Sequence, residues 1–176
     1  MSRENDIRVL SSLPPDKFAE YVLMQLRNLW AVDGLYFLGI EDEYGTQKAA
    51  EIDENVWEVM GKIEARKLKT FLGSTGTDIA SMMAALRLTS WALDLEDKEI
   101  IIKKNRAVIR NTKCRVQNTR LEKGLPEFGC KPVRLGFLKA FAAEFNKNIS
   151  VTCNVCPPDP HTKNLWCEWE FRLEKE

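Results

Sequence analysis

The segment from Cys130 to Cys167 constrains this chain most strongly. It contains four of the five cysteines in the 176-residue sequence, two of them as a Cys153-x-x-Cys156 pair. Pro132 suits the first turn of a helix, so a helix is predicted to begin beside Cys130. A thiol at that position lies near the positive end of the helix dipole, which favours its thiolate. The predicted helix carries one apolar stripe, formed by Val133, Phe137, Phe141 and Phe145.

Two strands are predicted after this helix. Alternation over residues 149–155 places Cys153 on an apolar face, and alternation from residue 165 places Cys167 on the same face as Trp169. Antiparallel pairing would direct both thiols to one side, with Cys156 at the turn and Cys130 at the start of the packed helix. Four converging thiolates are typical of a tetrahedral zinc site. One ion per chain is therefore expected, and it would be structural because four thiolates leave no open position.

Two other interpretations of the cysteines stay open. Free cysteine is among the most buried residue types, so the four side chains could simply be small core residues. A disulfide is disfavoured because nothing in the sequence marks secretion. A redox Cys-x-x-Cys begins a helix, whereas this one ends a strand and enters Pro157-Pro158. Cys114 is expected to lie outside the metal site.

The rest of the chain predicts an α+β protein. Residues 1–97 read as a helical N-terminal region: a helix starts at Ser11–Pro15 after a short polar lead, Gly45 ends it, and Thr46 caps the next. One strongly apolar helix is expected over residues 77–94. Residues 98–176 read as a zinc-binding α+β domain with a hairpin around Lys104-Asn105 and a polar loop with a helical turn over residues 115–124. We expect the helical half to pack on a four-stranded antiparallel sheet with a crossover helix (ββαββ), around one shared core.

One acidic residue stands out in the helical half. Asp33 lies on an apolar stripe, where an unpaired carboxylate is costly. It is either part of a ligand pocket or the N-cap of a second helix that begins after a break at Val32. The candidate pocket residues are Asp33, Tyr36, Glu41, Arg120 and Trp169, with Asp33 and Arg120 as the pair that orients a ligand.

Composition excludes several classes of partner. The 26 basic and 26 acidic side chains balance, so no broad electrostatic surface for nucleic acid or anionic membrane is expected. The N-terminus lacks an apolar signal core, and no apolar run approaches the length of a membrane span. These features predict a soluble cytoplasmic protein.

Residues 99–173 resemble the vinyl-reductase domain, a small-molecule-binding module. The resemblance rests on Cys130 at the start of the crossover helix, Gly136 within it, the Cys153 and Cys156 pair, and Cys167 on the last strand. It implies a zinc ion held by these cysteines beside a buried ligand pocket. The sequence departs from that family where Cys153 replaces a frequent glutamate and where the loop containing His161 is longer.

The whole chain, including residues 29–35, is also similar to an uncharacterised group of bacterial and archaeal cytosolic proteins. That group is distantly similar to L-2-amino-thiazoline-4-carboxylate hydrolases. Three functions are therefore expected, in order. The first is zinc-stabilised binding of a small apolar or aromatic ligand by a sensor, carrier or scavenger. The second is hydrolysis of a small cyclic amide-like or thiazoline carboxylate substrate. The third is a homodimeric interaction module without a ligand.

Overall fold

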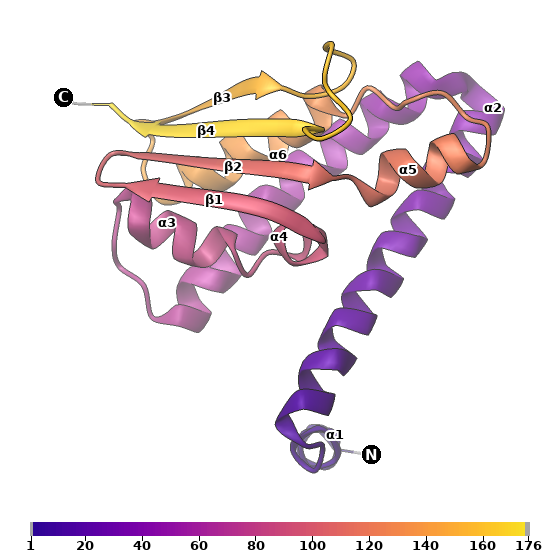
Figure 1. Cartoon of the computed structure of the whole chain (residues 1–176). Helices are drawn as coiled ribbons and strands as arrows, with labels where there is room; N and C mark the ends of the chain where they lie inside the picture. The colour runs from indigo at the N-terminus through magenta and orange to yellow at the C-terminus, as the bar shows by residue number, and fades with distance from the viewer. Residues whose placement is uncertain (1, 175–176) are drawn as a thin grey trace.

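A long helix that folds back on itself organises the molecule. The computed structural model describes residues 2–174, beginning with a short helix α1 (Arg3–Ser11) that the polar lead did not predict. Helix α2 (Pro15–Leu72) follows and reverses its direction at Gly45, whose φ of 81° suits glycine. The predicted helix end at Gly45 is thereby confirmed, and the two limbs of α2 diverge from this bend (Figure 1).

The apolar segment after α2 forms two helices rather than the single one expected over residues 77–94. Helix α3 (Ile79–Leu86) is capped by Asp78, and helix α4 (Ser90–Asp94) is capped by Thr89. The Thr89 hydroxyl accepts a hydrogen bond from the Ala92 N–H at 3.2 Å and donates one to the Leu86 carbonyl. These two bonds end one helix and start the next, so the side-chain chemistry of Thr89 overrides the continuous apolar pattern.

The sheet has the predicted four antiparallel strands in the order β1-β2-β4-β3. Strands β1 (Asp97–Lys103) and β2 (Arg106–Lys113) form the expected hairpin. Strands β3 (Ile149–Val155) and β4 (Cys167–Leu173) complete the sheet, and β4 pairs with both β2 and β3. The fold is thus α+β with the ββαββ arrangement that the sequence predicted.

Two helices lie between the second and third strands. The segment expected to be a polar loop with a helical turn forms a longer helix, α5 (Arg115–Glu122). The crossover helix α6 (Lys131–Ala143) begins beside Cys130 as predicted, and it packs between the sheet and the second limb of α2 (Figure 1). The two helices approach closely because Gly61 of α2 faces the backbone of Phe137.

One hydrophobic core joins the helical half to the sheet half. Phe137 and Phe141 of α6, Met82 of α3, and Trp169 and Phe171 of β4 are all fully buried in it. The predicted boundary near residue 97 therefore runs through a common core.

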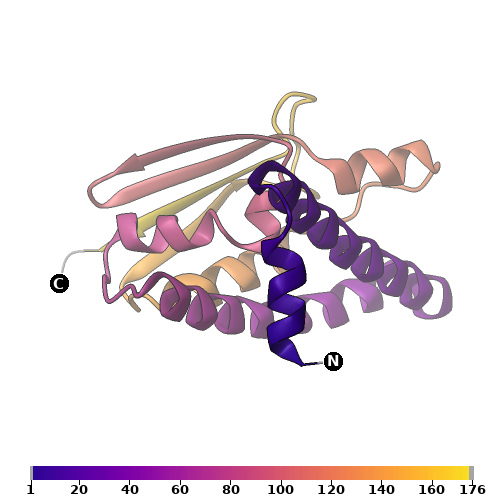
Figure 2. The same cartoon turned by 90° about the horizontal axis from the view of Figure 1, so that it is seen from below.

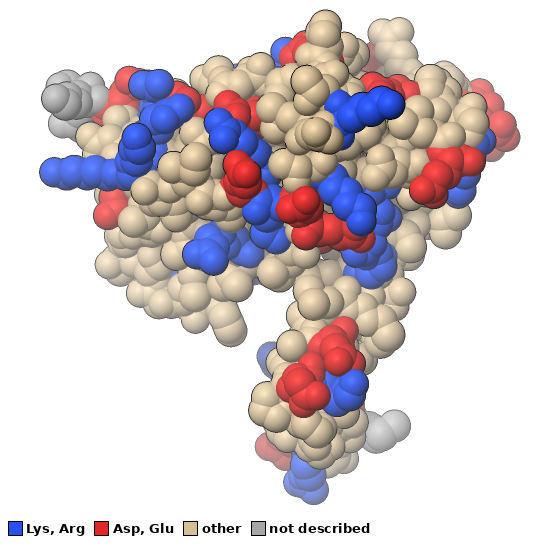
Figure 3. Space-filling model, in the orientation of Figure 1, with Lys and Arg blue, Asp and Glu red and all other residues tan. Residues whose placement is uncertain are grey.

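Helix α1 and the N-terminal part of the first limb of α2 project from this body (Figures 1 and 2), whereas Trp30, Asp33 and Glu41, further along the same limb, contact it. Within residues 2–174, no helix is both long and apolar enough to span a membrane. Acidic and basic side chains are interspersed over the face that carries the sheet (Figure 3). Ion pairs between neighbouring strands, such as Arg106 with Glu170 and Arg110 with Glu168, account for part of this pattern.

Candidate functional site

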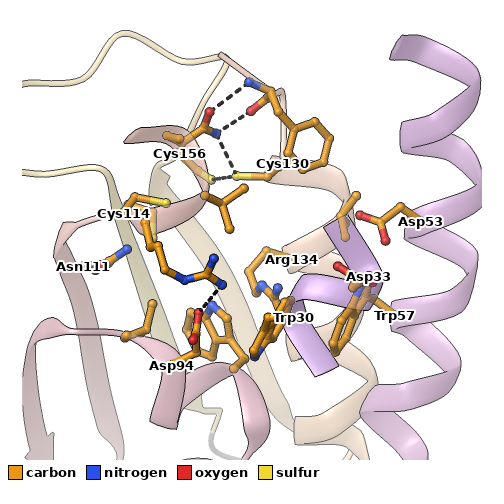
Figure 4. A pocket seen from close by; sticks show the side chains of 18 of the residues that line it. Trp30, Asp33, Asp53, Trp57, Asp94, Asn111, Cys114, Cys130, Arg134 and Cys156 are labelled. Carbon is orange, nitrogen blue, oxygen red and sulfur yellow. Dashed lines mark hydrogen bonds and ion pairs between the residues drawn. The ribbon is translucent and has the colours of Figure 1, made fainter. Parts of the chain in front are cut away.

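A small, largely enclosed cavity lies where both limbs of α2 meet α6 and the ends of β2 and β4. Its volume is about 100 Å³. Figure 4 shows the side chains that surround it. The four tryptophans of the lining are Trp30, Trp57, Trp91 and Trp169, and the polar lining includes Asp33, Asp53, Asp94, Arg115, Arg134, Cys114, Cys130, Cys156 and Cys167.

Arg134 of α6 places a guanidinium inside this aromatic enclosure. Its central carbon lies 5.0 Å from the ring centroid of Trp91, 5.2 Å from Trp57 and 5.7 Å from Trp30. These separations fall within the range of cation–π attraction, which is stronger where water is excluded. The rings hold the guanidinium in place, but they do not accept hydrogen bonds from its N–H groups as carboxylates do.

Two carboxylates from the two limbs of α2 approach the same region. Asp33 accepts a hydrogen bond from the Trp57 indole N–H at 3.2 Å, and burial raises the pKa of Asp33. Burial, together with the nearby charge of Asp33, raises the pKa of Asp53 to about 7. Two carboxylates this close disfavour double ionisation, so Asp53 carries a proton for part of the time near neutral pH.

Three N–H donors that line the cavity have no hydrogen-bond acceptor among the described residues. They are Nη1 of Arg134, Nε of Arg115 and the indole Nε1 of Trp169. Trp169 is fully buried, and although the Cys167 thiol lies in its vicinity, no hydrogen bond of good geometry joins them. Arg115 uses another nitrogen, Nη2, to bind Asp94 at 2.9 Å. Buried donors without acceptors are rare because each costs free energy.

Three of the predicted metal-binding cysteines line the other end of the cavity. The Sγ atoms of Cys130 and Cys156 are 3.4 Å apart. A hydrogen bond from the Cys156 thiol lowers the pKa of Cys167, and bonding to Cys130 and Cys167 raises the pKa of Cys156. Cys130, Cys156 and Cys167 thus form one thiol cluster between α6, the end of β3 and the start of β4.

The remaining two cysteines are placed differently from expectation. Cys114, expected outside the site, lines the cavity with the thiol cluster, and burial raises its pKa to about 12. Cys153 is half-buried on β3 opposite Trp169 and does not line the cavity. Across residues 2–174, no three His, Cys, Asp or Glu side chains are arranged to hold a metal ion as they stand.

Gln117 of α5 fixes the loop that leads into Cys130. Its amide donates to the Phe128 carbonyl at 2.7 Å and accepts from the Phe128 N–H at 2.9 Å. The same amide nitrogen lies 3.7 Å from the Cys130 sulfur. Gln117 therefore positions Cys130 relative to the cavity.

The predicted pocket residues do not all meet. Asp33 and Trp169 line the cavity, and because α2 is helical on both sides of Asp33, this residue is not an N-cap. Arg120 does not line the enclosed cavity, but with Asp33 it lines the more open hollow beside it. Its guanidinium makes two hydrogen bonds of 2.9 Å to Glu41, and this pair joins α5 to α2. Tyr36 is 72% exposed on the projecting limb.

Two central residues, Arg134 and Asp53, were missed by sequence reasoning. A signal for Arg134 was present, because it interrupts the apolar stripe of α6 between Val133 and Phe137. Asp53 gave no comparable signal, since it precedes Trp57 by one helical turn within a strongly acidic segment. Its role depends on the reversal of α2, which brings it beside Asp33.

A wider, more open hollow of about 340 Å³ adjoins the cavity. Trp30, Asp33, Asp53, Arg115 and Phe128 line both spaces. The wall that the two spaces share therefore includes both carboxylates.

Comparisons with known proteins show the fold but little about activity. A family of unknown function matches residues 11–173, and no curated protein matches the sequence. A crystal structure of a trafficking protein particle complex subunit 3 from Naegleria fowleri, covalently bound to palmitic acid, has a similar fold. Its TM-score is 0.54 at 11% identity, over 86% of this chain and 96% of that one. These comparisons give no support to the resemblance to the vinyl-reductase domain or to thiazoline-carboxylate hydrolases.

Proposed function

The chain belongs to DUF6125, a family of unknown function, and we propose that it binds a small molecule in the cavity between α2, α6 and the sheet. The observation that carries the proposal is the set of three buried donors without acceptors in one aromatic enclosure. An enclosed, mostly apolar cavity with a few convergent polar groups is the usual form of a ligand site. A bound molecule would satisfy the donors and contact the tryptophans.

The dimensions of the cavity limit the ligand. A cavity of about 150 Å³ holds a benzene-sized molecule, so the enclosed space of about 100 Å³ takes only part of a small ring compound, whose remainder would lie at the boundary with the adjoining hollow. A long acyl chain such as the palmitic acid of the structural neighbour is too large for this space. The raised pKa of Cys114 also disfavours covalent attachment there, because the thiolate is the nucleophile.

A zinc ion beside the cavity is the second element of the proposal. Ligands at about 2.3 Å from zinc in a tetrahedron have sulfur atoms about 3.8 Å apart, and the Cys130 and Cys156 sulfurs are 3.4 Å apart. Cys130, Cys156 and Cys167 would hold the ion. Cys153 is the fourth ligand that the sequence predicts, and Cys114 is the alternative that shares the cavity. The ion would stabilise the junction of α6 with β3 and β4.

Native mass spectrometry of the purified protein tests ligand binding directly. We expect a retained small molecule, or a gain in melting temperature with ring compounds of six to eight heavy atoms. Val116→Trp should close the boundary between the two hollows and abolish the gain, because Val116 lines both. Leu121→Trp, at another exposed position of α5, is the matched control. A protein that is empty and unaffected by every such compound would contradict the proposal.

Hydrolysis of a small cyclic amide-like or thiazoline carboxylate substrate is an alternative that one observation favours. A carboxyl group with a pKa of about 7, such as Asp53, is suited to general acid–base catalysis at neutral pH. Incubation with 2-amino-thiazoline-4-carboxylate and chromatography of the products tests it. Product formation that Asp53→Asn abolishes would favour the enzyme, and a lack of turnover would exclude this substrate.

Homodimerisation is favoured by the projecting arm, defined as residues 3–44. Large apolar side chains along it are exposed, among them Phe18, Met24, Leu29, Val32 and Leu35. A second copy pairing arm to arm would cover these side chains. Leu35→Glu should then yield monomers in sedimentation experiments, whereas Phe71→Glu, at an exposed site outside the arm, should not. A monomeric wild-type protein would exclude the dimer.

A further inference from the structure

The cavity contains two opposite kinds of unsatisfied polar group. One kind is the set of donors without acceptors, Arg134 Nη1, Arg115 Nε and Trp169 Nε1. Donors in this setting require a carboxylate or another strong acceptor, and the guanidinium of Arg134 is suited to a planar carboxylate. A ligand that only filled the space with carbon would leave all three donors unsatisfied.

The other kind is a pair of carboxylates without cations. Within residues 2–174, neither Asp33 nor Asp53 makes an ion pair with a lysine or arginine. Their polar neighbours are the Trp57 indole and the more distant charge of Arg134. Both carboxylates are half-buried, so a donor or cation that reached them would interact in a partly desolvated environment.

The other charged groups of the lining are already paired. Asp94 binds Arg115 at 2.9 Å and Arg27 at 3.1 Å. The charges that remain are one guanidinium and two carboxylates, of which Asp53 is partly protonated near neutral pH. A simple anion would therefore approach Arg134 against the field of two acids, and a simple cation would meet Arg134 inside the cavity. A molecule that carries both charges can place its negative group near Arg134 and its positive group near the two carboxylates.

We infer that the ligand is a small zwitterion of the amino-acid type, with its carboxylate toward Arg134 and Trp169 and its ammonium toward Asp33 and Asp53. The inference rests on the proposed small-molecule function and names its ligand class. The tryptophans Trp30, Trp57 and Trp91 surround the hydrocarbon part. Entry past Asp33 and Asp53 leaves the ammonium at the boundary with the open hollow and takes the carboxylate into the enclosed cavity.

Three compounds built on a five-membered ring test the charge pattern; the first two have the same number of non-hydrogen atoms, and the third lacks the carboxyl group. L-Proline carries both charges, cyclopentanecarboxylate carries only the negative one, and pyrrolidine carries only the positive one. Calorimetric titration of the full chain with each probe at pH 7 should give the tightest binding with proline. The two single-charge probes should each bind at least about tenfold more weakly, because a hydrogen bond to a charged group contributes roughly 1.5–3 kcal/mol.

Variants assign the two ends of the ligand. Asp53→Asn should weaken proline binding about tenfold and leave cyclopentanecarboxylate binding unchanged or tighter, because only proline has an ammonium. Arg134→Lys should weaken the binding of proline and of cyclopentanecarboxylate, which both carry a carboxylate, and leave the binding of pyrrolidine unchanged. Arg66→Lys, at an exposed arginine that pairs with Glu144, is the matched control and should not change the affinity for any of the three probes. Zinc content and melting temperature are measured for each variant, so that a loss of fold is distinguished from a loss of recognition.

The outcomes separate this inference from the function on which it rests. Equal affinity for all three probes, or preference for cyclopentanecarboxylate, would overturn the zwitterion while small-molecule binding stands. Binding of no probe, by a protein that is also empty in native mass spectrometry, would overturn both. If Arg134→Lys loses zinc while proline affinity is retained, Arg134 serves the thiol cluster and the assigned orientation is wrong.

Discussion

Trp30 and Trp57 stack face to face across the two limbs of α2, with ring centroids 4.6 Å apart and planes inclined by 6°. The two residues are brought together because α2 reverses at Gly45. The Trp57 indole also donates to Asp33, and its ring meets Phe137 edge to face at 5.8 Å. A single pair of indoles therefore joins the helical hairpin, the acidic residues of the cavity and the crossover helix.

This stack should dominate the stability of the hairpin. Trp57→Ala removes a side chain that is only 4% exposed, and such truncations cost about 3–5 kcal/mol. Trp57→Phe should cost less, because it keeps an aromatic surface but loses the donor to Asp33. Urea unfolding followed by circular dichroism measures both. Equal, small losses for the two variants would mean that the hairpin does not depend on this contact.

The response to pH should report the buried acid pair. The pKa of Asp53 is about 7 in the folded chain, well above the usual value of about 3.9 expected for an unfolded aspartate. Between these values the folded state binds more protons than the unfolded state. The contribution of Asp53 to stability therefore falls as pH rises from about 4 to about 7 and is constant above that range.

Asp53→Asn should consequently be more stable than the wild type at pH 8, by an amount on the order of 1–3 kcal/mol after allowance for partial exposure. The advantage should shrink toward pH 4. Asp42→Asn, at an exposed position of the same helix, is the control and should show no such trend. Chemical denaturation at several pH values makes the comparison. A stability difference that does not vary with pH would show that the Asp53 carboxyl is not perturbed.

The architecture could be predicted from the sequence because its signals are local. Strand alternation, the hairpin at Lys104-Asn105 and the glycine at position 45 each act over a few residues. The division of residues 77–94 was missed because the Thr89 cap lies within an apolar run, where hydrophobic periodicity hides it. Only one helical turn was predicted where the eight-residue helix α5 lies, because its sequence is polar and its buried anchor, Gln117, gives no periodic signal.

The candidate site was only partly accessible from the sequence because it depends on long-range packing. Asp33 was identifiable as a charge on an apolar stripe. Its expected partner, Arg120, forms an ion pair with Glu41, a contact between α5 and α2 whose partners lie 79 residues apart in the sequence. Arg134 faces the acids because α6 packs between the limbs of α2 and the sheet, and no local pattern specifies that arrangement.

The contact between α2 and α6 should depend on the absence of a side chain at Gly61. A Cβ atom there would lie 2.5 Å from the Phe137 carbonyl oxygen. This oxygen belongs to the backbone of α6, so it cannot move away without shifting the helix. Gly61→Ala should therefore separate the helices and destabilise the protein by about 1–3 kcal/mol, as overpacking does. Thermal unfolding of the variant measures the effect.

Gly136 of α6 provides the matched control. A Cβ atom at this position would meet only Glu54 and Glu58 side-chain carbons at 3.8 Å, an ordinary contact. Because alanine is the better helix former, Gly136→Ala should be neutral or stabilising by up to about 1 kcal/mol. Similar effects of the two substitutions would contradict the close approach at Gly61.

The proposed zinc ion can be tested through the positions of the five cysteines. Cys156 is fully buried in the thiol cluster, so Cys156→Ser should lose zinc and, with it, several kcal/mol of folding free energy. The sequence predicts Cys153 as the fourth ligand, in which case Cys153→Ser loses zinc and Cys114→Ser retains it. The reverse result would assign the fourth position to Cys114, which lines the cavity. Elemental analysis of reduced, zinc-replete protein measures the content of each variant, and a wild-type protein without stoichiometric zinc would leave the cysteines as buried thiols of the core.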